Sequence, residues 1–304
     1  MAGMATWWAL RYLLNNVPPP KQVDLLDTLD PVARLDRKAF VLALLQKFAE
    51  TDQVIETAAA GSWLVSDVKE GDGYVTFGLS KTHRPTNVGI QKQGKFESFR
   101  RMETRVEVVV LPDREQQWVF CKHDGRAARS AKTFKLVLES MLNLGVVRLR
   151  QSRYYDPEVI LRTEPAEFSK WRSTVKTVEE VHFRYRENLP IGVSDDKLNQ
   201  IETLASKFNA IVPGHEVVTT IKKPSLSEEL IGDLDKFGSR ARMKFGAVGR
   251  TATNRRVPFE SDHPKAAKPA IVPEEIGVAE LVKLLKLDLE SEVELKADGA
   301  DADG

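Results

Sequence analysis

Alternating basic and apolar residues near the C-terminal end of the chain form the clearest chemical pattern in the sequence. Residues 240–245 read Arg, Ala, Arg, Met, Lys, Phe. Alternate side chains of a β-strand point to opposite faces, so Arg240, Arg242 and Lys244 are expected to share one face while the apolar residues pack on a core. Clustered lysine and arginine side chains neutralise phosphates and release counterions, which drives binding of nucleic acids without sequence specificity.

The basic stretch extends beyond this strand. Residues 236–259 contain seven basic side chains and no acidic one. A hairpin of residues 240–248 and 255–260 would bring them onto one surface, which we predict as a nucleic-acid interface. The seven residues are Lys236, Arg240, Arg242, Lys244, Arg250, Arg255 and Arg256. The alternative is a solvated strand face whose charges are balanced by distant acids, such as those of the C-terminal tail.

A second basic stretch lies on a predicted amphipathic helix over residues 126–144. Its apolar residues repeat at helical spacing, and Arg126, Arg129 and Lys132 occupy the remaining surface with no acid among them. We add these three residues to the predicted interface. An anionic membrane surface or an acidic protein can also bind such a face, and an ordinary exposed helix face is the alternative.

The polar segment 81–101 contains a third group of basic residues. Phe96 and Phe99 lie among them, and Glu97 is the one acid. Aromatic rings beside cations can stack on the bases of single strands. A surface loop that its two phenylalanines anchor to the core is the alternative, and it is the interpretation that we favour.

Residues with catalytic chemistry are scattered. None of the five histidines has another His, Cys or carboxylate at the spacing of metal ligands. Cys121 precedes Lys122 and His123, which can lower the pKa of its thiol, but a lone cysteine at the end of a strand is usually structural. Glu294 and Lys296 resemble the acid-x-lysine element of some nucleases, without the strand and helix that such a site needs. We therefore predict no catalytic residue, metal or cofactor; an enzyme whose site combines distant residues is the alternative.

The bulk composition is that of a globular intracellular protein. The chain has 304 residues, of which 42% are hydrophobic and 29% charged, enough for two domains. A single cysteine excludes a disulfide framework, and no apolar run approaches the roughly 20 residues that span a bilayer. We expect a cytoplasmic protein. The net charge of +1 predicts no partner by itself, but residues 288–304 are strongly acidic.

The order of apolar patterns and turn signals predicts an α+β fold of two units, with antiparallel hairpins packed on helices. The first unit, residues 1–145, reads strand, helix, hairpin, hairpin, helix. The expected ranges are 6–14, 37–50, 63–80, 105–121 and 126–144. Asp36 is expected to cap the first helix and Gly145 to end the second.

The second unit, residues 146–262, mixes strands and helices. Strands are expected over 146–150, 178–186, 217–223, 240–248 and 255–260, and helices over 165–173, 195–209 and 225–237. Ser225 and Glu228 have the spacing of a capping box. Residues 263–273 are expected to form a linker, followed by a helix over 274–287 and a disordered acidic tail to residue 304.

This order of elements resembles that of the RexA family of lambda-type phage exclusion proteins and related phage-defence proteins. The resemblance covers about residues 5 to 260 and includes the hairpin over 63–80, the polar loop after it, and the Leu189-Pro190 loop before the helix over 195–209. The proline-rich linker and the acidic tail depart from the family pattern.

The resemblance implies a DNA-binding sensor that dimerises and acts with a membrane partner encoded nearby, and it brings no catalytic residues. Together with the basic residues it favours a non-enzymatic nucleic-acid-binding protein in phage defence, with non-specific DNA as the expected ligand. The alternatives are a protein-interaction or regulatory subunit that binds an acidic protein, and a nuclease-like enzyme.

Overall fold

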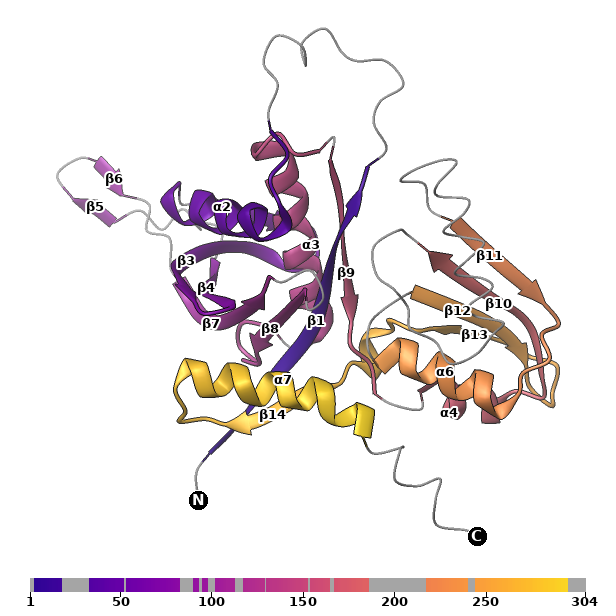
Figure 1. Cartoon of the computed structure of the whole chain (residues 1–304). Coiled ribbons are helices and arrows are strands. Elements are labelled where there is room, and N and C mark those ends of the chain that lie inside the picture. Colours follow the sequence, from indigo (N-terminus) through magenta and orange to yellow (C-terminus); the bar gives the residue numbers. More distant parts are fainter. Residues whose placement is uncertain are drawn as a thin grey trace, which may run out of the picture.

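The computed structural model describes residues 3–17, 33–51, 53–82, 90–92, 95–97, 102–112, 117–128, 130–152, 154–164, 167–185, 217–239 and 244–294 of the chain. Helices pack on a larger and a smaller antiparallel sheet (Figure 1). This arrangement confirms the α+β fold that the sequence predicts.

The larger sheet has eight strands within the described ranges. Seven follow the order β14-β1-β8-β7-β4-β3-β2, and β9 also pairs with β1. Their bounds are β1 Met4–Asn16, β2 Ile55–Thr57, β3 Gly61–Gly71, β4 Tyr74–Thr82, β7 Met102–Leu111, β8 Trp118–Lys122, β9 Tyr155–Leu161 and β14 Pro269–Pro273. The short strands β5 (Ile90–Lys92) and β6 (Lys95–Glu97) pair only with each other.

Helices cover both faces of the larger sheet. α2 (Arg37–Glu50) and α3 (Ala131–Arg148) lie on one face, and α7 (Val278–Glu294) crosses the other (Figure 1). The long strand β1 alternates accordingly. Leu10, Tyr12 and Leu14 enter the core beneath α2 and α3, whereas Trp7 and Ala9 enter the core beneath α7. A strand buried on both faces must be apolar throughout, which explains the nearly continuous apolar run at the start of the chain.

The smaller sheet has the order β11-β10-β12-β13, with helices on one face. Its strands are β10 Thr177–Tyr185, β11 Val217–Lys222, β12 Lys244–Arg250 and β13 Arg256–Glu260, and its helices are α4 Glu167–Thr174 and α6 Glu228–Ser239. Val181, Phe183 and Phe245 face the helices. Their neighbours along β10 and β12 therefore point to the face opposite α4 and α6, which we call the open face.

Two local predictions are confirmed at the level of single contacts or pairings. Asp36 caps α2 and accepts a hydrogen bond from the backbone N–H of Ala39 at 2.8 Å. The hairpins β3–β4, β7–β8 and β12–β13 are present and antiparallel. The capping residue of α6 differs, because Ser227 rather than Ser225 accepts from the N–H of Leu230, at 3.2 Å. The predicted helix over 195–209 lies outside the described residues.

Gly145 does not end α3, contrary to the prediction. The helix continues to Arg148, so the predicted strand over 146–150 is wrong. A Cβ on Gly145 would overlap Cδ1 of Leu44 on α2. The glycine is therefore needed for the close approach of two helices and not for a change of backbone direction.

The C-terminal region is more ordered than its composition predicts. Residues 264–266 form a short 3₁₀ helix, and β14 pairs with β1, so the expected linker completes the larger sheet. α7 extends through residue 294 and includes the first part of the acidic segment. Its position is fixed by Arg162, a buried residue that donates to the carboxylate of Asp288 and, at 3.0 Å, to its carbonyl oxygen. The larger sheet thus contains strands from all three predicted regions.

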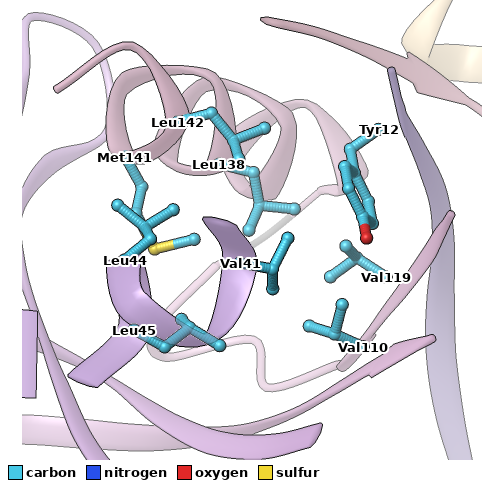
Figure 2. A pocket seen from close by; sticks show the side chains of 9 residues that line it. All are labelled: Tyr12, Val41, Leu44, Leu45, Val110, Val119, Leu138, Met141 and Leu142. Atoms are coloured by element: carbon cyan, nitrogen blue, oxygen red, sulfur yellow. The ribbon is translucent and has the colours of Figure 1, made fainter. Parts of the chain in front are cut away.

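A small apolar void lies between α2, α3 and the larger sheet. Its volume is about 20 Å³, and Figure 2 shows side chains from both helices and the sheet around it. The lining residues are Tyr12, Val41, Leu44, Leu45, Val110, Val119, Leu138, Met141 and Leu142. With this size and lining, it is a packing gap in the core and not a ligand site.

Candidate nucleic-acid interface

The β12–β13 hairpin holds the best exposed part of the predicted basic surface. Arg250 and Arg256 are register partners across the two strands, so their side chains share one face. Arg255 and Arg256 are exposed and have no ion pair among the described residues. Arg250 is partly neutralised, because its Nε lies 2.5 Å from a carboxylate oxygen of Glu179. This end of the hairpin therefore presents cations to solvent.

Lys244, at the other end of β12, has a different environment from the one predicted. Its Nζ lies 2.5 Å from Glu158 of β9 and 3.8 Å from Asp262, and its side chain is 23% exposed. The predicted interface required Lys244 to face solvent or a phosphate. The sequence could not indicate the ion pair, because Glu158 lies far away in the chain, on a strand that was not predicted.

Lys244 belongs to a cluster of five charged side chains that joins the two sheets. Lys135 of α3 lies 2.6 Å from Asp262 and 4.0 Å from Glu139. Lys135 and Lys244 therefore share the carboxylate of Asp262. We call the cluster of Lys135, Glu139, Glu158, Lys244 and Asp262 the charged junction. The charged junction brings α3 and the start of β12 together. Its two lysines are paired with its three carboxylates, so it is not a continuous basic surface.

The electrostatics of the charged junction follow from partial burial. Burial raises the pKa of the Glu139 carboxyl. Burial alone would also raise the pKa of Asp262, but the charge and hydrogen bond of Lys135 outweigh it, so this pKa is lowered. Burial opposes ionisation of Lys244, yet the carboxylate of Glu158 outweighs it and raises the pKa of the lysine. Lys244 and Asp262 therefore both favour their charged forms.

The basic face of α3 begins differently from the prediction. The helix starts at Ala131, so Arg126 precedes it and lies 3.5 Å from Asp124 with its side chain 84% exposed. Lys132 is exposed in the first turn and has no ion pair among the described residues. The position of Arg129 lies outside the described residues, as do Arg240, Arg242 and the side chain of Lys236. The structure thus places Lys132 and Arg126 on the surface and leaves these four without a description.

The open face of the smaller sheet contains two cations that the sequence did not single out. Arg184 of β10 is the register partner of Lys244, and Lys222 of β11 is the partner of Glu180. Arg184 and Lys222 are exposed and have no ion pair with a described residue. Glu180 and Glu260 lie on the same face, so it is mixed rather than uniformly basic. The sequence contains a signal for Arg184: it alternates with the apolar Val181 and Phe183 along the strand, which predicts that it points away from the core.

The structure offers little catalytic chemistry. Cys121 is fully buried, and burial raises the pKa of its thiol, which is opposite to the lowering that its neighbours suggested. In the parts of the chain that the structure describes, no group of His, Cys, Asp and Glu has the geometry of a metal site. The carboxylates of the charged junction are held by lysines. The acid-x-lysine element cannot be compared, since Lys296 lies outside the described residues.

Of the helices in the described ranges, none combines the length and the apolar character needed to cross a membrane. Family models, curated proteins and solved structures contain no match to this chain.

Proposed function

We propose that the protein binds nucleic acid without sequence specificity, through the smaller sheet and its β12–β13 hairpin. The observation that supports this function is the set of exposed cations without an ion pair to a described residue, on the hairpin and the open sheet face. These residues are Arg184, Lys222, Arg255 and Arg256. Arg240 and Arg242, which precede Lys244 in the chain, add two positive charges to the same region of the sequence.

The physical basis of this binding is charge density. Each phosphate that a lysine or arginine neutralises releases condensed counterions, so affinity depends on the number of contacts and not on base sequence. Lys244 is assigned a different role. Since Glu158 and Asp262 hold Lys244, this lysine fixes the position of β12 relative to the larger sheet. The exposed cations named above then contact the phosphates.

Binding is tested by fluorescence anisotropy with labelled duplex and single-stranded DNA, and with RNA, at low salt. We expect binding of the DNA duplex that weakens steeply as salt rises. The double variant Arg255→Glu/Arg256→Glu should lose most of the affinity, because both side chains are exposed and their replacement leaves the core intact. The matched control is Lys47→Glu/Lys283→Glu, which changes the net charge equally at two exposed lysines on α2 and α7.

The control separates a local effect from one of net charge. An equal loss of affinity in both variants would show that binding depends on the net charge and not on the hairpin. Unchanged affinity in the hairpin variant would refute the proposed surface. Absence of binding to every nucleic acid at low salt would leave the acidic-protein partner as the better function. Circular dichroism of each variant checks the fold.

The resemblance to the RexA family extends the proposal to phage defence. It adds an expectation of homodimers and of a membrane or protein partner encoded nearby. Light scattering coupled to size-exclusion chromatography tests the first, and co-purification from the native host after nuclease treatment tests the second. A monomer at all concentrations would contradict the expected dimer.

A further inference from the structure

A cleft of about 280 Å³ lies on the face of the larger sheet that α7 partly covers. One wall is formed by β1 and by the beginning of α7 with the residues before it. The floor is formed by β3, β4, β7 and β8, beyond the edge of the helix. The cleft is close in size to the smaller ligand pockets of proteins, which begin at roughly 300 Å³. It is far from the β12–β13 hairpin in the topology of the fold.

The wall of the cleft is mostly apolar, and Glu274 is the charged residue in it. Trp7, Ile276, Val278 and Leu281 contribute to it. Trp7 and Leu281 are buried in the core beneath α7, whereas Val278 is 44% exposed at the first position of the helix. This wall can therefore cover a planar or aliphatic group, and the exposed Val278 would be buried by such a ligand.

The floor contains an arginine, Arg105, that pairs with a carboxylate on the neighbouring part of the sheet. A Cβ on Gly78 would lie 2.6 Å from Nε of Arg105, so the arginine side chain lies across the glycine and a larger residue there would displace it. Asp67 holds the other end of the side chain, with 2.8 Å between its carboxylate and the guanidinium. Asp67 has φ of +50° at the irregularity between Ser66 and Lys69, a conformation that costs energy in a non-glycine residue and clusters at functional sites.

Arg105 keeps its capacity to bind a further group. Its side chain is 54% exposed, and a guanidinium has five N–H donors, of which Asp67 uses a part. A pre-organised arginine loses less rotational freedom when it receives a carboxylate or phosphate. Gly78 and Asp67 together thus hold an anion-binding group at the floor of the cleft.

Further charges line the cleft around Arg105. Lys69 is exposed and has no ion pair with a described residue, and Lys122 lies 3.5 Å from Glu107. Of the carboxylates, Asp67 and Glu107 are engaged with cations, and the carboxylate of Glu274 lies beside Gly3, where a Cβ would be 2.7 Å from its Oε2. Lys69 and Arg105 therefore form the cationic part of the site, opposite a mostly apolar wall.

We propose that this cleft binds a small organic anion. Its carboxylate or phosphate would be held by Arg105 and Lys69, and its planar or aliphatic body would lie against Trp7, Ile276 and Leu281. This site is separate from the nucleic-acid interface and does not depend on it.

The proposal is tested by isothermal titration calorimetry of the full chain with phenylacetate and phenyl phosphate. Inorganic phosphate supplies the anion without the apolar body, and phenethylamine supplies the same ring with the opposite charge. We expect one or both aromatic anions to bind more tightly than either control. Binding of only one of them identifies the preferred head group.

Two variants connect the binding to the proposed residues. Arg105→Gln and Lys69→Gln should each weaken it about tenfold, as expected for loss of a charge-assisted hydrogen bond. Lys69 is exposed and makes no ion pair within the described part of the chain, so its variant reports on binding even if Arg105→Gln perturbs the fold. Lys47→Gln on α2 is the matched control. The proposal is overturned if neither anion binds, if phenethylamine binds as tightly, or if both variants retain full affinity.

Discussion

Lys244 of β12 donates to Glu158 of β9 at 2.5 Å, across the boundary between the two sheets. The two side chains are 23% and 18% exposed, so the contact is partly protected from solvent. Lys135 and Lys244 both approach Asp262, which extends the contact into the charged junction. A strand predicted to contact phosphates therefore has a structural role at one end and an exposed cationic surface at the other.

The coupling between Lys244 and Glu158 is expected to be measurable. Lys244→Met should lower the free energy of unfolding by about 1–3 kcal/mol, because it leaves a partly buried carboxylate without its donor. In a double-mutant cycle with Glu158→Gln, the coupling energy should be about 0.5–3 kcal/mol. Urea denaturation of the four proteins measures it, and strictly additive effects would show that the pair contributes nothing specific.

Two carboxylates of the charged junction should respond to pH with opposite signs. The pKa of Asp262 is lowered in the folded protein, so its stabilisation is present above the unfolded pKa, about 3.9, and is lost as pH falls through the folded pKa. Asp262→Asn should therefore be less stable than the parent near neutral pH, with the difference vanishing in acid.

Glu139 should behave in the opposite way. Burial raises its pKa, so its ionised form opposes folding at neutral pH. Glu139→Gln should be more stable than the parent at neutral pH and equal to it in strong acid. Denaturation midpoints across the acidic and neutral range test both variants, and a shift of the same sign in the two would contradict the assignment.

A pair of helical glycines gives a matched test of packing. Gly145→Ala gains roughly 1 kcal/mol of helix propensity but forces Leu44 to move in a close-packed core, at a cost of about 1–3 kcal/mol. We expect a net loss of stability. Gly232→Ala on α6 meets no atom within 4 Å and should gain about 0.5–1 kcal/mol. Thermal unfolding compares them, and a gain in both would show that Gly145 has no packing role.

The salt dependence of DNA binding should count the contacts of the hairpin. If Arg255 and Arg256 each neutralise a phosphate of a duplex, Arg255→Gln/Arg256→Gln should reduce the slope of log K against log salt by about 1.8. Lys47→Gln should leave the slope unchanged. A lower affinity with the parent slope would indicate that the two arginines do not contact phosphates.

Patterns within a few residues predicted most helices and strands correctly. They could not predict which distant residues contact each other. Asp36 marks the start of α2 because capping involves residues three apart. The exposed face of the β12–β13 hairpin followed from strand alternation. The ion pair between Lys244 and Glu158, in contrast, depends on β9, whose apolar residues lie among charged ones and gave no clear period. Gly145 was misread because a glycine that ends a helix and one that admits a neighbouring helix look identical in one sequence.

The pairing of β1 with β14 has a consequence for the order in which the chain folds during synthesis. Residues at the start of the chain wait for Pro269–Pro273 to be translated before this edge of β1 is covered. Trp7 stays exposed until α7 follows, since both belong to the same core. β1 is thus made before β14 and α7 but is completed only after them, and ribosome-bound chains that lack β14 and α7 should present an apolar, chaperone-binding edge.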